Sequence, residues 1–199
     1  MNKYQVHPTA VIDEGALIGE GCTIWHFCHI SGGASIGKGC TLGQNVYVAP
    51  KVNIGQRVKI QNNVSLFTGV IVEDDVFLGP SCVFTNILTP RSEVNRKDQF
   101  LKTTVKKGAS IGANAVVLCG NEIGRYAMVG AGSVVTKSIK DFELVAGNPA
   151  VHFGWVGRYG DKLHFDSDGW AECKKTGYRY FLSDGEVKEY ISSKEKSVK

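Results

Sequence analysis

Asn86 and the polar segment after it are the residues of this sequence best suited to bind and orient a reacting group. Asn86 ends a regular run of short apolar segments, and residues 89–103, TPRSEVNRKDQFLKT, break that regularity at Pro90. The segment is basic, through Arg91, Arg96, Lys97 and Lys102. Because guanidinium groups bind phosphates through paired hydrogen bonds, it is either a solvated surface loop or a clamp for a pyrophosphate.

Polar side chains also recur at intervals of 18 residues. His26, Gln44 and Asn62 follow this spacing, and Asn63 comes directly after the last of them. Imidazole and carboxamide groups both donate and accept hydrogen bonds. On one outward edge they would form either a polar stack that satisfies itself and helps protomers associate, or a row of contacts for a polar ligand.

The elements that position these residues follow a six-residue repeat. From Gln5, fourteen consecutive hexads (residues 5–88) carry a large apolar residue at the second place, and six more follow from Thr104 to Ile139. A helix needs apolar residues at intervals of about 3.6, and a half-buried strand at intervals of two. The hexads instead predict an all-β parallel β-helix with triangular coils of three hexads, so that residues 18 apart stack. At about 4.8 Å per coil the prism would be roughly 32 Å long. The period does not fix its handedness.

The third and sixth places of the hexads hold small residues. Glycine is frequent at the third place, which suits a bend, and the sixth place suits a corner with little room. Four cysteines occupy the sixth place: Cys22, Cys28, Cys40 and Cys82. We expect them to be reduced, buried thiols. Cys22 and Cys40 are one coil apart, so geometry alone does not exclude a disulfide between them. Cys119 falls at an outward place, and the sequence offers no activating partner for it.

Several motifs make the chain similar to a known family. The hexads together with IWHF, KIQNNV, VFTN followed by PR and RK, and the later AGNPA resemble the hexapeptide-repeat acyltransferases over about residues 5–190. The resemblance is strongest to bacterial enzymes that acetylate the 3-amino group of nucleotide-linked sugars, in particular UDP-2-acetamido-3-amino-2,3-dideoxy-D-glucuronate for O-antigen synthesis. It implies a left-handed β-helix, acetyl-CoA as donor co-substrate, no metal, and a homotrimer with its sites between protomers.

The resemblance also implies roles for particular residues. Asn86 would hold the attacking amine, and His26 and His29 are rival bases. A free amine attacks a thioester readily, so positioning and charge stabilisation would be the main tasks. The sugar nucleotide would contact Gln44, Asn62, Asn63, Arg91, Arg96 and Lys97. The donor would lie along SIGANA and MVGAGS, at Gly112, Ala113, Gly130 and Ala131, with Lys106, Lys107, Arg125 or Lys137 at the phosphates of CoA.

Composition narrows the possible partners. The formal net charge of +4 on 199 residues is too small to indicate nucleic-acid binding by itself. The chain lacks a run of about 18 apolar residues that would insert into a membrane. Its first residues, MNKYQVHPTA, lack the apolar core of a signal peptide, which favours the cytoplasm.

We expect two structural units. Residues 1–145 would form the β-helix, with a loop insertion at 89–103, and residues 146–199 an appendage. The appendage is predicted to contain a short capping helix at 151–165, a β-hairpin of YRYFL and EVKEYI turning at Ser183-Asp184-Gly185, and a disordered end at 192–199. Cys173 has Thr176 where a CxxC partner would stand, so the pattern does not predict a zinc site.

Other functions fit parts of the sequence. A hexapeptide-type carbonic anhydrase would need three histidines around a metal, and only His26 and His29 are close in sequence. A dTDP-linked 3-amino-3,6-dideoxyhexose is an alternative acceptor, since the cations of the insertion could serve the pyrophosphate alone. A non-catalytic structural or binding solenoid would make the break after Asn86 incidental. The acidic turn at residues 73–75 is expected to be solvated only.

Overall fold

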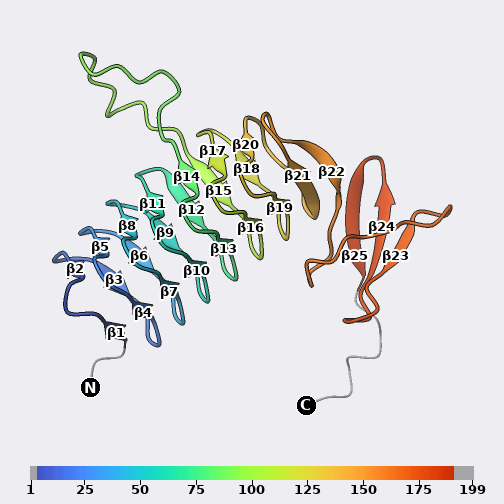
Figure 1. Cartoon of the computed structure of the whole chain (residues 1–199), viewed down its shortest axis with the longest axis horizontal. Coiled ribbons are helices and arrows are strands. Elements are labelled where there is room, and N and C mark those ends of the chain that lie inside the picture. Colours follow the sequence, from blue (N-terminus) through green and yellow to red (C-terminus); the bar gives the residue numbers. More distant parts are fainter. Residues whose placement is uncertain (1–3, 191–199) are drawn as a thin grey trace.

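Three parallel sheets wind into a prism in the computed structural model, which describes residues 4–190 (Figure 1). Sheet A contains β1 (Gln5–Val6), β4 (Thr23–Ile24), β7 (Thr41–Leu42), β10 (Lys59–Ile60), β13 (Phe77–Leu78), β16 (Ser110–Ile111), β19 (Met128–Val129), β21 (Glu143–Ala146) and β22 (Val151–Trp155). Sheet B contains β2 (Val11–Ile12), β5 (His29–Ile30), β8 (Tyr47–Val48), β11 (Ser65–Leu66), β14 (Val83–Phe84), β17 (Val116–Val117) and β20 (Val134–Val135). Sheet C contains β3 (Leu17–Ile18), β6 (Ser35–Ile36), β9 (Asn53–Ile54), β12 (Val70–Val72), β15 (Thr103–Val105) and β18 (Glu122–Ile123). These stacked parallel coils agree with the predicted left-handed parallel β-helix of hexapeptide repeats.

Strand pairing confirms that one coil contains 18 residues. Gln5 of β1 pairs with Thr23 of β4, and the same spacing continues to the pair of Lys59 with Phe77. In the next coil the spacing becomes 33, as in the pair of Phe77 with Ser110. The difference, 33 − 18, places 15 extra residues in that coil.

The extra residues form a loop that projects from the corner between sheets B and C, between β14 and β15 (Figure 1). It leaves the prism after Asn86 and returns at Leu101, whose N–H donates to the Asn86 carbonyl at 2.9 Å. The expected insertion at residues 89–103 is therefore shifted along the chain. Thr103 is fully buried and pairs with Val70. Its polar side chain hides this strand residue from a hydrophobic pattern.

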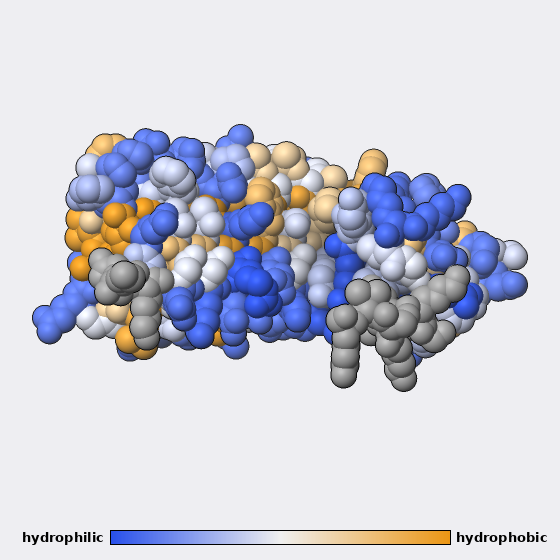
Figure 2. Space-filling view, turned by 90° about the horizontal axis from the view of Figure 1, so that it is seen from below, coloured by the Kyte–Doolittle hydropathy of each residue, from blue (hydrophilic) through white to orange (hydrophobic). Residues whose placement is uncertain are grey.

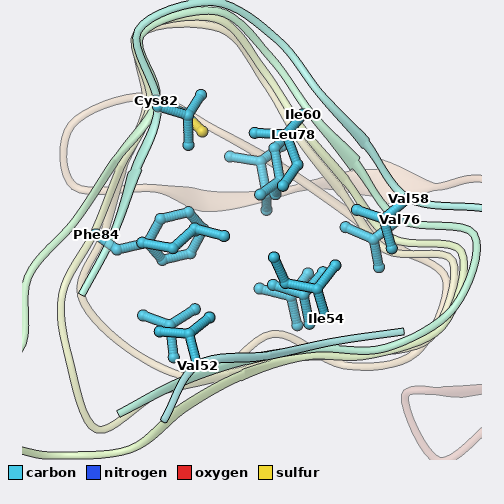
Figure 3. Packing of buried hydrophobic residues seen from close by; sticks show 14 of the residues in the cluster. Val52, Ile54, Val58, Ile60, Val76, Leu78, Cys82 and Phe84 are labelled. Atoms are coloured by element: carbon cyan, nitrogen blue, oxygen red, sulfur yellow. The ribbon is translucent and has the colours of Figure 1, made fainter. Parts of the chain in front are cut away.

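The inside of the prism is filled by the second- and sixth-place residues. Figure 3 shows Ile54, Ile60, Leu78 and Phe84 pointing inward from the strands. The sixth-place residues fill the corners of the triangle: Val52, Val58, Val76 and Cys82. Burying one such Val, Leu, Ile or Phe side chain contributes about 1.5–3 kcal/mol, so this continuous core is the main stabilising feature of the prism.

The corners turn at the fifth place of most hexads. Residues there adopt a left-handed backbone, for example Asn45 and Asn63 with φ of 60° and 61°. We expected glycine at the third place because it allows a bend, but the structure gives a different reason for it. A Cβ on Gly79 would lie 2.7 Å from the backbone nitrogen of Ala113 in the next coil. The close stacking of coils therefore requires glycine at this place.

The four sixth-place cysteines are free and buried, as predicted. The thiols of Cys22, Cys28 and Cys40 donate to carbonyls of the neighbouring coil, as between Cys28 Sγ and the Gly43 oxygen at 3.0 Å. Burial raises the pKa of Cys82 to about 12. The expectation that Cys119 faces outward is wrong, since this residue is only 3% exposed. Its backbone N–H donates to Thr85 Oγ1 at 2.9 Å, and the adjoining Gly120 lies near Leu101 at the returning end of the loop.

The expected helix at residues 151–165 is wrong. Val151–Trp155 form β22, which runs antiparallel to β21, and residues 4–190 contain no helix. The segment carries Gly154, Gly157 and Gly160, and glycine disfavours helix formation. The predicted hairpin is confirmed: β24 (Arg179–Ser183) pairs with β25 (Glu186–Tyr190), and β23 (Trp170–Glu172) completes a small antiparallel sheet.

The C-terminal sheet shares a hydrophobic cluster with the last coil. Phe142 from the prism is buried and its ring lies 5.5 Å from that of Tyr180 in an edge-to-face contact. The expected boundary after residue 145 falls inside β21 (Glu143–Ala146), so the appendage continues directly from sheet A. Residues 192–199, which we expected to be disordered, lie outside the described residues.

The opposite end of the prism exposes apolar side chains among the described residues. Val11 and Leu17 in the first coil are 55% and 66% exposed. Figure 2 shows hydrophobic side chains gathered at this N-terminal end, and hydrophilic side chains along the length of the same face. The inward second-place residues of this coil, Val6, Ile12 and Ile18, are only half-buried, so the first coil gains less from burial than the inner coils.

Candidate functional site

The outward polar residues lie on the three edges of the prism, at the fourth and fifth places of the hexads. Coils are numbered by the strands of sheet B, so that β5 belongs to coil 2 and β14 to coil 5. The AB edge, between sheets A and B, carries His26-Phe27, Gln44-Asn45, Asn62-Asn63, Pro80-Ser81, Ala113-Asn114 and Ala131-Gly132. The BC edge carries Gly32-Gly33, Pro50-Lys51, Thr68-Gly69, Asn86, Cys119-Gly120 and Lys137-Ser138. The CA edge carries Glu20-Gly21, Lys38-Gly39, Gln56-Arg57, Asp74-Asp75, Lys107-Gly108, Arg125-Tyr126 and Asp141-Phe142.

Amide side chains in coils 3 and 4 of the AB edge partly serve the prism itself. Asn62 Oδ1 accepts a hydrogen bond from the Gln44 backbone N–H at 2.9 Å. Asn63 Oδ1 accepts one from Asn45 Nδ2 at 3.1 Å. These bonds join successive coils and use the oxygens of two predicted substrate ligands. The side chain of Gln44 is exposed and bonds to no other residue within 4–190, so its carboxamide is open to a ligand.

His26, the predicted second candidate for catalysis, lies in an aromatic cluster. Its ring stacks on that of His7 with centroids 3.5 Å apart, and it is nearly parallel to that of Trp25 at 6.2 Å and 7°. His26 is in coil 2 and Asn86 in coil 5, about 14 Å apart along the axis at about 4.8 Å per coil. Within one protomer, His26 is too far away to act on a group held by Asn86.

Asn86 lies on the BC edge at the base of the projecting loop. It is half-buried, and its side chain makes no hydrogen bond to another residue in the described part of the chain. Two coils further along the same edge is Lys137, which is exposed and has no side-chain partner within residues 4–190. The rival base His29 is on the outer face of sheet B, where its Nε2 lies 3.1 Å from Asp13 Oδ2. Asn86 thus has a free carboxamide and no neighbouring base from its own coil.

The loop cations make hydrogen bonds only within the loop. Arg91 Nη1 donates to the Pro90 carbonyl at 3.1 Å, and Arg96 Nη1 donates to Gln99 Oε1 at 3.0 Å. Lys97 is exposed. Each guanidinium has five N–H donors, so both arginines retain donors for an anion.

The same loop exposes apolar side chains. Leu88, Val94, Phe100 and Leu101 are 62%, 42%, 37% and 38% exposed. The loop projects away from the prism of its own chain (Figure 1). Apolar groups gathered on a projecting segment are typical of a surface that meets a partner.

The AB edge changes character at coil 5. Its fourth place carries larger groups in coils 2–4, namely His26, Gln44 and Asn62, and small ones in coils 5–7, namely Pro80, Ala113 and Ala131. Gly112 and Gly130 flank the small residues. A Cβ on Gly112 would collide with the backbone of the next coil, so coil stacking alone accounts for this glycine. The late coils therefore present a smooth strip against which an extended ligand could lie.

The remaining candidates for CoA phosphates are elsewhere, on or beside the CA edge. Lys106 Nζ lies 2.6 Å from Glu122 Oε1, and Arg125 Nε lies 2.7 Å from Asp141 Oδ2. The hydrogen bond from Lys106 to Glu122 raises the pKa of Lys106. These cations are paired and are not adjacent to the strip on the AB edge, so the structure does not bring them together with the predicted donor residues.

The acidic turn at residues 73–75 is more than solvated, contrary to expectation. Asp75 receives two hydrogen bonds from Arg57, at 2.6 and 2.9 Å, and Glu73 Oε2 accepts the Lys107 N–H at 2.9 Å. The bonds from Arg57 hold the pKa of Asp75 below its ordinary value. This edge is a ladder of opposite charges that joins coils.

The predicted site residues fall into two groups on different edges. The AB edge carries His26, Gln44, Asn62, Asn63, Ala113 and Ala131, and the BC edge carries Asn86, Lys137 and the loop with Arg91, Arg96 and Lys97. Sheet B separates the two edges, so one protomer does not bring them together. A site that uses both groups needs two copies of the chain. Sequence reasoning missed His7 and Trp25, although an aromatic residue at the third place, where other coils have glycine, was a visible signal.

Residues 4–190 contain neither a cluster of metal ligands nor a membrane-spanning helix. No three His, Cys, Asp or Glu side chains there are arranged to hold a metal ion. The same residues contain no helix that is long and apolar enough to cross a membrane.

Two family models match the prism. The model described as bacterial transferase hexapeptide (six repeats) matches residues 15–50 and 33–68. The model described as hexapeptide repeat of succinyl-transferase matches residues 103–137. No matched segment includes the projecting loop, and the regular coil residues 69–86 before it are also unmatched.

Among curated proteins, the chain is similar to sugar acetyltransferases. It is 52% identical over 95 residues to dTDP-3-amino-3,6-dideoxy-alpha-D-galactopyranose 3-N-acetyltransferase of Aneurinibacillus thermoaerophilus, covering 47% of this chain and 48% of the relative. It is 32% identical over 87 residues to galactoside O-acetyltransferase of Lactococcus lactis, covering 42% of each. The chain thus spans about half the length, or less, of these relatives.

Solved structures share the fold. The acetyltransferase domain of PglB from Neisseria gonorrhoeae, in complex with acetyl coenzyme A, has a TM-score of 0.51 at 18% identity and covers 76% of this chain and 58% of its own. A variant of GDP-perosamine N-acetyl transferase from Caulobacter crescentus, in complex with CoA and GDP-perosamine, has a TM-score of 0.50 at 22% identity, with 76% and 56% coverage. WeeI from Acinetobacter baumannii has a TM-score of 0.51 at 26% identity, with 74% and 57% coverage.

Proposed function

We propose that this hexapeptide-repeat chain is an acetyl-CoA-dependent N-acetyltransferase that acetylates the 3-amino group of a nucleotide-linked sugar. The observation that carries the proposal is the position of Asn86. It lies on the BC edge in coil 5, the coil at which the AB edge changes from polar residues to small ones. A polar acceptor along the early coils and an extended donor along the late coils would meet at that level. The 52% identity to a dTDP-amino-sugar N-acetyltransferase supports the same reaction.

The site is proposed to form between two copies of the chain in a homotrimer. The polar and small residues of the AB edge and the free carboxamide of Asn86 are on different edges, separated by sheet B. A closed ring of three copies can place the AB edge of each protomer against the BC edge of the next. The exposed Leu88, Val94, Phe100 and Leu101 of the loop would then gain a surface to cover them.

Asn86 is proposed to orient the attacking amine. Acetyl-CoA supplies an activated acyl group as a thioester. In the transfer, the amine nitrogen forms a bond to the acyl carbon, the carbon–sulfur bond breaks, and the amine proton passes to the departing sulfur or to solvent. A free amine needs no strong base for this, and Asn86 has no neighbouring base within its own coil. The contribution of Asn86 is therefore positioning, which lowers the entropic part of the barrier.

Small residues on the AB edge and one cation on the BC edge fit acetyl-CoA as the donor. Ala113 and Ala131 leave only small side chains at the fourth place of the late AB edge, and Lys137, on the BC edge, is an exposed cation without a partner in residues 4–190. The small residues would border the pantetheine arm, and the lysine would meet a phosphate. Lys106 and Arg125 are less suited, since carboxylates already pair with them.

The acceptor nucleotide and sugar are the finer part of the proposal. A UDP-linked 2-acetamido-3-amino-2,3-dideoxy-D-glucuronate would place its carboxylate and pyrophosphate near Arg91, Arg96 and Lys97, whose donors remain available. A dTDP-linked 3-amino-3,6-dideoxyhexose is the second candidate, favoured by the relative named above. In either case the product would enter O-antigen or other cell-surface polysaccharide synthesis, and the reaction would take place in the cytoplasm.

The test is thiol release from acetyl-CoA with a panel of UDP- and dTDP-linked 3-amino sugars. Each amino sugar is paired with the matching 3-hydroxy sugar, because one similar protein is an O-acetyltransferase. We expect release with at least one 3-amino sugar and none with its 3-hydroxy partner. Turnover of dTDP-6-deoxy sugars alone would remove the uronate assignment. No release with any member would leave the non-catalytic solenoid as the better account.

A further inference from the structure

A cluster of aromatic rings marks the first two coils at the AB edge. His7 stacks on one face of His26 with centroids 3.5 Å apart, and Trp25 lies nearly parallel to His26. Phe27 adds a tilted ring 6.1 Å from that of His26. Elsewhere on this edge, the third place is Gly43, Gln61, Gly79, Gly112 and Gly130, and the fifth place is Asn45, Asn63, Ser81, Asn114 and Gly132. The rings are thus confined to one end of the edge.

The cluster is exposed at a corner of the prism. Trp25 and Phe27 are 47% and 59% exposed, so core packing does not explain these rings. Phe27 has φ of 57°, a left-handed backbone that is costly for a bulky residue. The hydroxyl of Thr9 accepts the Phe27 N–H at 3.1 Å and helps to hold this conformation. Other corner residues share this backbone, for example Arg57 and Tyr126, each with φ of 55°, so the feature that distinguishes Phe27 and Trp25 is the exposure of their rings.

The position of the cluster matches one part of a nucleotide sugar. It lies in coil 2, three coils before Asn86, which is about 14 Å along the axis. This is about the span of an extended nucleoside diphosphate sugar from its base to its sugar ring. Between the two positions, the free carboxamide of Gln44 lies in coil 3, one coil from His26. A carboxamide has an NH2 donor group beside a carbonyl acceptor, which complements the N–H and carbonyl edge of a pyrimidine.

We propose that Trp25 and His26 form a stacking platform for the pyrimidine base of the acceptor nucleotide, with Gln44 bonding to the edge of the base. The inference rests on the proposed function for the sugar that the nucleotide carries. It gives His26 a binding role in place of the catalytic one. Asn86, from a second copy, would then hold the sugar amine at the other end of the same groove.

The test measures binding of UDP and of dTDP to the full chain by calorimetry, without acetyl-CoA. Stacking of a base on an aromatic side chain is worth about 1–3 kcal/mol, so Trp25→Ala should raise the Kd of both nucleotides on the order of tenfold. Inorganic pyrophosphate should bind the variant as it binds the wild type, because it has no base. Trp25→Phe should bind UDP nearly as well as the wild type. UDP should quench tryptophan fluorescence of the wild type but not of Trp25→Phe.

Phe153→Ala, which removes an exposed aromatic ring from β22 (63% exposed), is the matched control and should bind UDP normally. Equal UDP affinity of Trp25→Ala and the wild type, or loss of pyrophosphate binding as well, would overturn the platform. So would a wild type that does not bind UDP or dTDP. A Trp25→Ala chain that no longer assembles would identify the cluster as a contact between copies. If UDP binds with the expected quenching but no amino sugar is acetylated, the proposed function fails while the platform stands.

Discussion

Mixing two impaired variants should restore activity if each site is built from two edges of different copies. The perturbations are Ala131→Glu, which places a charged side chain on the smooth strip of the AB edge, and Asn86→Ala, which removes the carboxamide from the BC edge. Ala131 is exposed, and Asn86 bonds to no other described residue through its side chain, so neither change should prevent folding. Homotrimers of either variant contain no intact site.

The size of the restored activity follows from the geometry. In a ring of three, each site takes its AB edge from one copy and its BC edge from the next. A site is intact only when the AB edge comes from the Asn86→Ala chain and the BC edge from the Ala131→Glu chain. At equal amounts and random assembly this gives 1/2 × 1/2, or about 25% of sites. Every mixed ring contains one such site, so rings purified by a tag on each chain should reach about one third of wild-type activity.

The assay is co-expression of the two chains, purification through both tags, and thiol release from acetyl-CoA with the preferred amino sugar. The control pairs Asn86→Ala with Lys137→Glu, two changes on the BC edge. That mixture should show only the mean activity of its parent homotrimers. Activity of the first mixture that does not exceed its parents, with mixed rings present, would refute a site shared between copies.

Three further predictions follow from the same structure. Asn86→Ala should lower kcat at least tenfold, on the order of 1.4 kcal/mol, in steady-state kinetics; an unchanged kcat in an intact assembly would make the residue a bystander. Gly79→Ala should lower the free energy of unfolding in denaturant titrations more than Gly33→Ala does. A Cβ at Gly79 would meet backbone 2.7 Å away, whereas a Cβ at Gly33 would meet nothing within 4 Å and would be disfavoured only by the left-handed φ of 77°. An equal loss in the two variants would contradict the role given to coil stacking. Burial raises the pKa values of Cys40 and Cys82 from 9.0 to about 11 and about 12. They predict a contribution to stability that is fully present below pH 9.0 and is lost as pH rises through about 11 for Cys40 and about 12 for Cys82, since the unfolded chain releases these thiol protons first. Replacing both cysteines by alanine should flatten that pH dependence.

The repeat was readable from the sequence because each coil uses the same physical rule at the same places. A large residue such as Ile60 or Leu78 at the second place and a small one such as Cys82 at the sixth place fix the coil, and the pairs 18 apart follow. Local exceptions were less visible. Thr103 is a buried polar strand residue, and Cys119 is buried although it occupies a fourth place.

The candidate site was only partly predictable for a similar reason. The hexad frame placed His26, Gln44 and Asn62 on one edge, and the structure keeps them there. The frame also allowed Asn86 to be assigned to an adjoining face, but spacing along the chain does not reveal that sheet B holds the two edges apart. Nor does it reveal that the Asn62 oxygen is used by the coil below, or that Arg125 already has a carboxylate partner. These depend on the packing of one coil against the next.

The most direct test of the central claim follows the acetyl group itself. Acetyl-CoA labelled in the acetyl group is incubated with the protein and a UDP- or dTDP-linked 3-amino sugar, and the sugar nucleotide is isolated for mass spectrometry and NMR. The account predicts one labelled acetyl group, in amide linkage to the nitrogen at C3. Unmodified sugar nucleotide throughout the panel, or label found only on a hydroxyl oxygen, would contradict it.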